Sequence, residues 1–357
     1  MNILHLNPRL NITCGISKTI YNICINVNNS FNYFLICFGG DAVDYFKSKG
    51  LNVTVIPRPA SFVSYISLLV KLYKFIKTNR IDIVHSHHRI FDSIIFFLRQ
   101  FTKMKTLTSV HSKVYGKKIF SYKADVLIAV SKTIFNHLIN YFHKKRERIY
   151  LINNFASIDK FENIKFDKPE VLNAVSPNSK IILFIGRLDE EKGIDILLEA
   201  IKVLQNDAEG DKYFLIIVGD GKMRKYCKNF IDENNLYAAT VEATTRVIDF
   251  YNITDVVVLP SRVDPFPLVV LEAGLMQKPF IGSKVDGIEE IIDDGTDGIL
   301  CESGNVKSLV AAICNVLEDQ ELATTLAKNL HRKIINNYTA DTILPKYQEL
   351  YKELKRE

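Results

Sequence analysis

Two carboxylates, Asp264 and Glu272, stand with seven residues between them in the stretch VVVLPSRVDPFPLVVLEAGL, which covers positions 256–275. The apolar, β-branched run at 255–259 predicts a buried parallel strand. The prolines within 260–265 indicate a loop after that strand. Acids at this spacing can accept hydrogen bonds from two different parts of one polyhydroxylated ligand.

The apolar residues from Pro267 onward predict a helix, which would begin where the missing N–H of a proline costs nothing. The free amides of Leu268 and Val269 would then point out of the helix N-terminus and attract phosphate or sugar oxygens. Together with the two acids, these amides suit a nucleotide sugar.

A second candidate segment is GRLDEEKG, at positions 186–193. Gly186 ends a predicted strand, and Arg187 and Lys192 lie five residues apart on the loop that follows. Arg187 can make a forked hydrogen bond and Lys192 can act as a point charge, so the pair suits a diphosphate. The alternative is that both cations pair with the neighbouring acids at 189–191.

Histidines follow two strands of the N-terminal half, in IDIVHSHH and TLTSVHS. Residues just past the carboxyl ends of parallel strands face the crevice in which α/β sheets bind ligands, and we expect His111 to lie there. For His85, His87 and His88 we expect a polar loop. No third ligand with metal-site spacing accompanies them, so no metal site is expected.

The segment from Ser261 to Ala273 resembles the signature SxxEPFGLVxLEA of retaining glycosyltransferases of family 4, which have the GT-B fold. Asp264 replaces the usual glutamate and Pro267 the usual glycine, and GRL…KG at 186–193 also matches. Gly15 matches the second of two adjacent glycines in a donor-facing loop, where Cys14 stands for the first. The signature is matched by Ser261, Pro265, Phe266, Leu268, Val269, Leu271, Glu272 and Ala273.

The resemblance implies roles for the matched residues. Arg187 and Lys192 hold the nucleotide diphosphate without a metal, and Glu272 binds the ribose. Asp264 and His111 lie at the donor sugar. The implied donor-binding set is Gly15, Gly186, Arg187, Lys192, Asp264, Phe266, Leu268, Val269 and Glu272. No cofactor is implied besides the donor substrate. A UDP-sugar is the expected donor, although the segment 236–254 does not identify the base.

Strand and helix patterns alternate along both halves, which predicts doubly wound parallel sheets. The 357 residues suit two α/β domains. We expect an acceptor domain at 1–165, a donor domain at 178–339, and a C-terminal helix at 340–357 that packs back on the first domain. The resemblance implies two Rossmann-like domains that face each other across a cleft. The first strand lacks a following GxGxxG, which disfavours a nicotinamide dinucleotide.

Charge differs between the halves. Residues 1–165 hold 24 Lys+Arg and 8 Asp+Glu, a balance of +16, and the remainder holds 22 and 32, a balance of −10. The basic half suggests an anionic membrane surface, and the alternative is a solvated, lysine-rich surface. The basic run 64–80 fits an interfacial helix, but ordinary packing on a sheet is the preferred interpretation. Nucleic-acid binding is not expected, because no interleaved aromatic platform is present.

No apolar run approaches the ~18 residues of a membrane span. The N-terminus MNILHLNP reads as a strand and not as a signal peptide, and the six cysteines lack CxxC spacing. These features predict a cytoplasmic enzyme, peripheral on the inner face of the membrane, of unspecified oligomeric state. The expected activity is sugar transfer to a saccharide or lipid-linked acceptor in bacterial surface-polysaccharide biosynthesis. The alternatives are a cytosolic metabolite glycosyltransferase and an inactive GT-B subunit that binds carbohydrate or a partner.

Overall fold

The computed structural model describes residues 1–357 apart from 13, 26–29, 119–120, 158–165, 208–210 and 357. It divides into two compact units. The first contains Met1–Asn154 and Ala340–Glu357, and the second contains Phe155–Thr339. The domain boundary expected at residue 165 lies outside the described residues.

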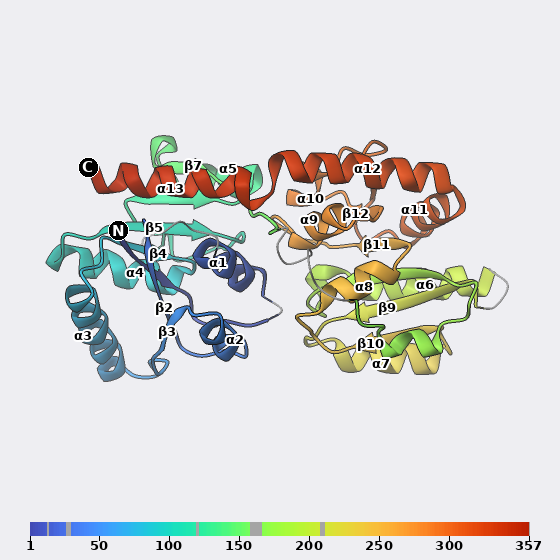
Figure 1. The fold of residues 1–357 in the computed structure, drawn as a ribbon, viewed down its shortest axis with the longest axis horizontal. Helices are drawn as coiled ribbons and strands as arrows, with labels where there is room; N and C mark the ends of the chain where they lie inside the picture. Colours follow the sequence, from blue (N-terminus) through green and yellow to red (C-terminus); the bar gives the residue numbers. More distant parts are fainter. Residues whose placement is uncertain (13, 26–29, 119–120, 158–165, 208–210, 357) are drawn as a thin grey trace. The chain divides into compact units, whose positions relative to one another are not determined.

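The first unit is built on a seven-stranded parallel sheet in the order β3-β2-β1-β4-β5-β6-β7 (Figure 1). Its strands are β1 (Asn2–Leu6), β2 (Asn32–Cys37), β3 (Asn52–Val55), β4 (Ile83–Ser86), β5 (Lys105–Val110), β6 (Val126–Ala129) and β7 (Ile149–Leu151). Its helices are α1 (Gly15–Ile25), α2 (Val43–Ser48), α3 (Phe62–Thr78), α4 (Arg89–Leu98), α5 (Lys132–Asn140) and α13 (Ala340–Arg356).

Helices cover both faces of this sheet because neighbouring residues of a strand point to opposite sides. Ile36 of β2 packs in a cluster with Leu72 of α3 and Ile95 of α4. Its neighbour Leu35 packs in another cluster, with Ile20 of α1 and Phe46 of α2. The C-terminal helix α13 buries its apolar side chains within the same unit, among them Tyr347 and Tyr351.

The second unit has a six-stranded parallel sheet in the order β10-β9-β8-β11-β12-β13. Its strands are β8 (Lys180–Ile185), β9 (Tyr213–Val218), β10 (Ala238–Val241), β11 (Val256–Leu259), β12 (Phe280–Ser283) and β13 (Ile299–Cys301). Its helices are α6 (Ile194–Asp207), α7 (Arg224–Glu233), α8 (Val247–Ile253), α9 (Leu268–Leu275), α10 (Asp286–Ile291), α11 (Val306–Glu318) and α12 (Gln320–Asn337).

The central strands of the second unit are continuous apolar runs. Every residue of β9 and β11 is buried, as expected of parallel strands covered on both faces. The sheets confirm the predicted fold class of two Rossmann-like, doubly wound α/β domains. The described residues also form short 3-10 helices. Two lie in the first unit, η1 (Arg99–Phe101) and η3 (Arg146–Arg148), and two in the second, η5 (Glu170–Ala174) and η6 (Glu190–Lys192).

Candidate active site

The segment 256–275 folds as strand β11, a loop and helix α9. Pro267 is the N-cap residue with an extended ψ of 128°, so the helix begins at Leu268, one residue later than the sequence predicts. Within the described chain, no hydrogen bond reaches the amides of Leu268 and Val269. These two N–H groups are therefore available to an anionic or hydroxylated ligand at the helix N-terminus.

The loop acid Asp264 is paired with the loop cation Lys192. Asp264 is 4% exposed, and its Oδ2 accepts from the Lys192 ammonium in an ion pair. Burial raises the pKa of the Asp264 carboxyl, while the Lys192 charge acts in the opposite direction. Two residues that the sequence assigned to different parts of the donor thus contact each other in this structure.

The two loops that carry this pair are fastened together by a second pair of side chains. Arg262 makes a forked hydrogen bond to Asp195, with Nη1 and Nη2 at 2.8 and 2.6 Å from its two carboxylate oxygens. The Arg262 amide also donates to the Glu191 carbonyl at 2.7 Å. The bidentate geometry fixes one loop against the other, so Arg262 and Asp195 position the ion pair. Sequence analysis missed both residues.

Gly193 brings the same loops into close approach. Its φ is +68°, a left-handed conformation that favours glycine, and a Cβ atom there would lie 1.9 Å from the Pro260 carbonyl oxygen. A similar contact exists between Gly219, after β9, and the carbonyl of Gly186, after β8. Gly219 therefore permits the tight packing of the two strand-end loops, and Gly186 contributes its backbone carbonyl to this contact.

Arg187 lies on the surface of its loop, and its side chain is 52% exposed. Its guanidinium pairs with Asp189 at 2.8 Å and with Glu191 at 2.9 Å. The alternative considered from sequence, that the cations pair with neighbouring acids, is therefore what this structure shows for Arg187. Exposed pairs of this kind contribute little stability, so a diphosphate can compete for the side chain.

Glu272 lies within α9 and is 6% exposed. The hydroxyl of Tyr251, on α8, donates to its Oε2 at 3.0 Å. Burial together with the Glu272 charge raises the pKa of Tyr251 well above its ordinary value, which keeps this hydroxyl a donor. Sequence analysis missed Tyr251, which orients the carboxylate.

The remaining residues of the expected donor-binding set in the second unit are apolar and mostly covered. Phe266 is buried and packs edge-on against Tyr338, with ring centroids 5.5 Å apart. Leu268 is also buried, and Val269 is partly buried. Contacts from these positions to a ligand would come mainly from backbone atoms.

In the first unit, His111 follows β5 and is partly buried. Its Nε2 lies 3.2 Å from Nδ1 of His87, and burial lowers the pKa of His111 to about 4. Gly15, which is exposed, begins α1. The structure places both residues in the unit formed by Met1–Asn154 and Ala340–Glu357, as the sequence order requires.

The expectation of a polar loop is wrong for His85, which lies in a strand, whereas His87 lies outside the strand but is buried. His85 lies in β4 and His87 just after it, and they are 0% and 2% exposed. His88 lies in the same connection and is the N-cap of α4. Sequence spacing indicated no third ligand for these histidines, but His5 of β1 lies beside two of them, and ring nitrogens of His5, His85 and His87 lie within 4.8 Å of one another.

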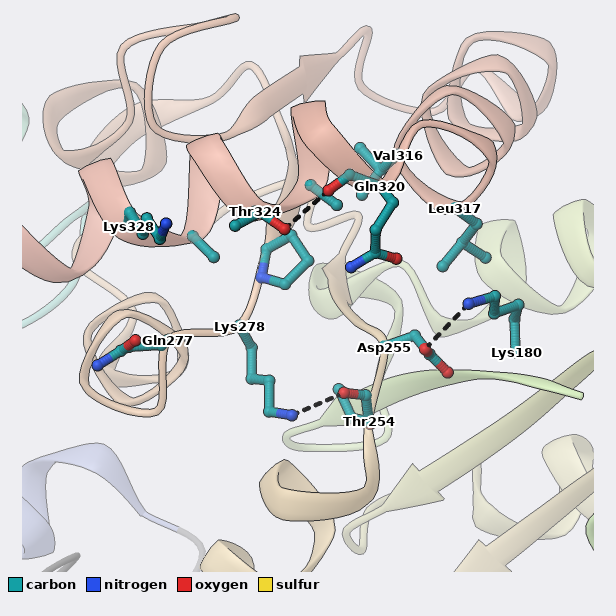
Figure 2. A pocket seen from close by; sticks show the side chains of 13 residues that line it. Lys180, Thr254, Asp255, Gln277, Lys278, Val316, Leu317, Gln320, Thr324 and Lys328 are labelled. Carbon is teal, nitrogen blue, oxygen red and sulfur yellow. Dashed lines mark hydrogen bonds and ion pairs between the residues drawn. The ribbon is translucent and has the colours of Figure 1, made fainter.

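A pocket of about 260 Å³ in the second unit lies at the opposite ends of the strands (Figure 2). It is lined by Lys180 at the start of β8, by Asp255 just before β11, and by residues of α11 and α12. In the same wall, Lys278 donates to the Thr254 carbonyl at 2.9 Å. The matched residues follow the carboxyl ends of β8 and β11, so this pocket is separate from them.

Comparison with known proteins adds an independent line of evidence. Residues 14–160 match the family model described as Glycosyltransferase Family 4, and residues 167–333 match that described as Glycosyl transferases group 1. The chain is 27% identical over 351 residues to the UDP-Gal:alpha-D-GlcNAc-diphosphoundecaprenol alpha-1,3-galactosyltransferase of Escherichia coli, covering 91% of this chain and 89% of that protein.

Solved structures show the same fold. A glycosyltransferase from Rickettsia africae ESF-5 superimposes with a TM-score of 0.84 at 21% identity, covering 99% of this chain and 98% of that one. The Anabaena protein Alr3699/HepE, in complex with UDP-glucose, gives a TM-score of 0.85 at 18% identity, covering 99% and 100%. With both units matched by family models, the chain belongs to the family 4 glycosyltransferases of the GT-B fold.

Proposed function

We propose that this chain is a retaining glycosyltransferase that moves a sugar from a UDP-sugar to a lipid-linked saccharide acceptor in bacterial surface-polysaccharide biosynthesis. The donor binds the second unit and the acceptor the first. The observation that carries the proposal is the buried ion pair of Lys192 with Asp264 beside the open amides at the start of α9.

Donor binding would rearrange this ion pair. The diphosphate carries more negative charge than one carboxylate, so Lys192 would turn from Asp264 to a phosphate oxygen, and Arg187 would leave its two acids, Asp189 and Glu191. Asp264 would then accept hydrogen bonds from hydroxyls of the donor sugar. Glu272, held by Tyr251, would accept hydrogen bonds from the ribose. We assign His111 to the donor sugar as well.

In the reaction, the bond between the anomeric carbon and the β-phosphate oxygen breaks, and its electron pair leaves with the nucleoside diphosphate. The acceptor hydroxyl oxygen bonds to the anomeric carbon on the same face, and its proton passes to the leaving phosphate oxygen. Negative charge grows on the diphosphate in the transition state. Fixed cations aimed at that charge stabilise it, so Lys192 and Arg187 would serve without a divalent metal ion.

The assignment of UDP as the nucleotide draws on similar proteins. The similar E. coli enzyme is named for a UDP-Gal donor and a diphosphoundecaprenol-linked acceptor, and the Anabaena structure holds UDP-glucose. The diphosphoundecaprenol-linked acceptor in the name of the E. coli enzyme belongs to the lipid-linked class that we propose here.

An exposed apolar face on α3 supports a membrane-held acceptor. Leu68, Leu72 and Ile76 pack in the core, yet Phe62 and Val63 are 80% and 74% exposed. The exposed large apolar residues of this helix are Phe62, Val63, Tyr65, Ile66, Val70 and Tyr73. A face of this size and character is typical of an interaction surface.

The charge around this face favours an anionic lipid surface. Lys71, Lys74 and Lys77 are exposed on the same helix, and each would contribute about 1 kcal/mol near an anionic leaflet. The helix would lie in the interface with its aromatic residues at headgroup depth. Among the described helices, none is both long and apolar enough to cross a bilayer.

A thermal-shift screen with UDP-, GDP-, ADP- and TDP-sugars, with and without EDTA, tests the donor half. A ligand at about 100 times its Kd stabilises the fold by roughly 2.7 kcal/mol, and we expect a UDP-sugar to do so equally with EDTA. No stabilisation of a folded sample by any donor would favour the non-catalytic carbohydrate-binding subunit. Transfer to soluble acceptors alone would favour the cytosolic metabolite transferase.

A further inference from the structure

Three histidines of the first unit form a hydrogen-bonded chain. Nδ1 of His5 lies 2.9 Å from Nε2 of His87, and Nδ1 of His87 lies 3.2 Å from Nε2 of His111. The three residues lie on β1, just after β4 and just after β5, which are adjacent strands of the sheet. The chain therefore runs from a buried ring, His5, to the partly exposed His111.

The three hydrogen-bonded histidines have only two consistent arrangements of their ring protons. Burial lowers the pKa of His5 to about 3 and that of His111 to about 4, and lowers that of His87 well below its ordinary value. All three rings are therefore neutral at pH 7, and each has one N–H and one bare nitrogen. If His5 donates to His87, then His87 must donate to His111. In the opposite arrangement, His111 donates to His87 and His87 donates to His5.

The buried end of the chain selects one direction. Nε2 of His5 is buried and has no hydrogen-bond partner among the described residues. In one arrangement this atom is a bare acceptor, and in the other it is an unpaired N–H. Among backbone groups, a buried N–H without a partner is rarer than an under-satisfied carbonyl. We apply the same preference to His5, so the hydrogen bonds run outward and each ring is protonated on Nδ1.

We infer that His5 and His87 are positioning residues that hold His111 as its Nδ1–H tautomer, so that His111 donates a hydrogen bond to a ligand oxygen and does not accept a proton. The inference rests on the proposed function in that the ligand is a donor sugar. Nδ1 of His111 makes no hydrogen bond to a described residue, so its N–H is available to a hydroxyl or phosphate oxygen.

The neighbouring His85 does not extend the chain. Its Nδ1 lies 2.8 Å from the Tyr351 hydroxyl of α13, and its Nε2 lies 2.7 Å from Oγ of Ser109. Because the hydrogen-bonded histidines end at Nε2 of His5, which has no partner among the described residues, a proton cannot pass beyond His5. The three histidines therefore fix a tautomer and do not conduct protons. A metal ion bound among His5, His85 and His87 would have to replace these hydrogen bonds.

The direct test is ¹⁵N NMR of the full chain labelled at the histidine rings, at neutral pH and without donor. We expect a protonated Nδ1 and a bare Nε2 for His111, with the His111→Gln spectrum identifying its signals. A protonated Nε2 on His111 would overturn the inference. So would zinc-induced shifts of the His5, His85 and His87 signals that EDTA reverses, whereas we expect added zinc to leave them unchanged.

A matched pair of variants tests the same point in the transfer reaction. The amide nitrogen of asparagine reaches the place of histidine Nδ1, and that of glutamine reaches the place of Nε2. We expect kcat/KM for the donor to be about tenfold lower in His111→Gln than in His111→Asn, the scale of one hydrogen bond. Equal values, or the opposite order, would contradict the donor role.

A third measurement addresses the positioning residues themselves. In His87→Leu we expect the His111 signals to show a mixture of tautomers while circular dichroism stays unchanged. A fixed Nδ1–H tautomer in that variant would overturn the role of His87. Because the wild-type spectrum requires no turnover, an inactive enzyme would refute only the proposed function, and a reversed tautomer would refute only this inference.

Discussion

Lys192 and Asp264, 72 residues apart in the sequence, form an ion pair in which the carboxylate is almost completely buried. The cation assigned to the diphosphate thus neutralises the acid assigned to the donor sugar. Removal of one partner would leave the other with an uncompensated charge, which is strongly destabilising when the charge is buried. Under the proposed function, a nucleotide sugar would have to separate the two charges of this pair.

Removal of the Tyr251 hydroxyl tests the role of Glu272. Tyr251→Phe deletes the 3.0 Å hydrogen bond to the buried carboxylate, and we expect a loss of about 1–3 kcal/mol in the free energy of unfolding. Because ribose binding changes little between ground state and transition state, the KM for the donor should rise while kcat stays nearly constant.

Tyr213→Phe is the matched control for that variant. Tyr213 is also a buried tyrosine of the second unit, and its hydroxyl donates to a carboxylate outside the matched segments, that of Glu318. Steady-state kinetics should show an unchanged KM in this control. If Tyr251→Phe and Tyr213→Phe have the same donor KM, Glu272 does not depend on Tyr251 for ligand binding.

A comparison of Gly193→Ala with Gly295→Ala separates the cost of backbone strain from the cost of disturbed packing between the loops. The left-handed φ alone costs about 1–2 kcal/mol for a residue with a Cβ, and here the Cβ would also meet the Pro260 carbonyl at 1.9 Å. Gly295 has a similar φ of +72° with open space around it. We expect Gly193→Ala to be clearly less stable than Gly295→Ala in urea denaturation, and equal losses would show that the close approach is unimportant.

The exposed face of α3 is tested by a double substitution, Phe62→Ser with Val63→Ser. We expect wild-type protein to sediment with phosphatidylglycerol vesicles at low salt and to dissociate at high salt, because the attraction is partly electrostatic. The double variant should bind about tenfold more weakly, since it loses the two most exposed apolar side chains of the helix.

The control for the vesicle experiment is Val203→Ser with Tyr237→Ser, a pair of exposed apolar residues in the second unit. This control should bind vesicles like the wild type. Wild-type protein that stays in the supernatant with anionic vesicles at low salt would refute membrane attachment through this unit.

Acid should destabilise the fold through its buried histidines. His5 has a folded-state pKa of about 3 and His111 of about 4, against about 6.5 in an unfolded chain. The unfolded state therefore binds more protons below pH 6.5, and stability falls as the pH drops from 6.5 towards 4. Each histidine changes the free energy of unfolding by up to about 1.4 kcal/mol per pH unit.

Urea denaturation at pH 7 and at pH 5 measures this effect. We expect the difference between the two pH values to shrink in His5→Phe and to persist in His143→Asn, which replaces an exposed histidine. An equal difference in wild type and His5→Phe would show that His5 is not a buried neutral group.

Local sequence patterns predicted much of the fold. The β-branched run before Pro260 and the apolar periodicity after Pro267 placed β11 and α9 to within one residue, because strand and helix periods are properties of neighbouring residues. The sites at strand ends followed from the same reasoning. Arg187 and Lys192 fall after β8, and His111 falls after β5.

Long-range pairings could not be predicted in this way. His5 approaches His87 only because β1 lies next to β4, and that strand order depends on the whole sheet. The fork between Arg262 and Asp195 joins residues 67 positions apart, and no local pattern distinguishes these two from other surface charges. Such contacts require the tertiary fold.

The most direct test of the account is the turnover of Lys192→Ala with a UDP-sugar and its acceptor. We expect a loss of at least about 100-fold, the scale of removing one preorganised charge contact to the transition state. Lys307→Ala, at an exposed lysine of α11, should keep full activity. The double variant Lys192→Ala/Asp264→Asn removes both charges of the pair. It therefore lacks the unpaired buried carboxylate that Lys192→Ala leaves, and a loss of turnover in the double variant cannot be due to that carboxylate. Loss of turnover in a folded Lys192→Ala would support Lys192 as the cation that stabilises the leaving diphosphate, and near-normal turnover would contradict it.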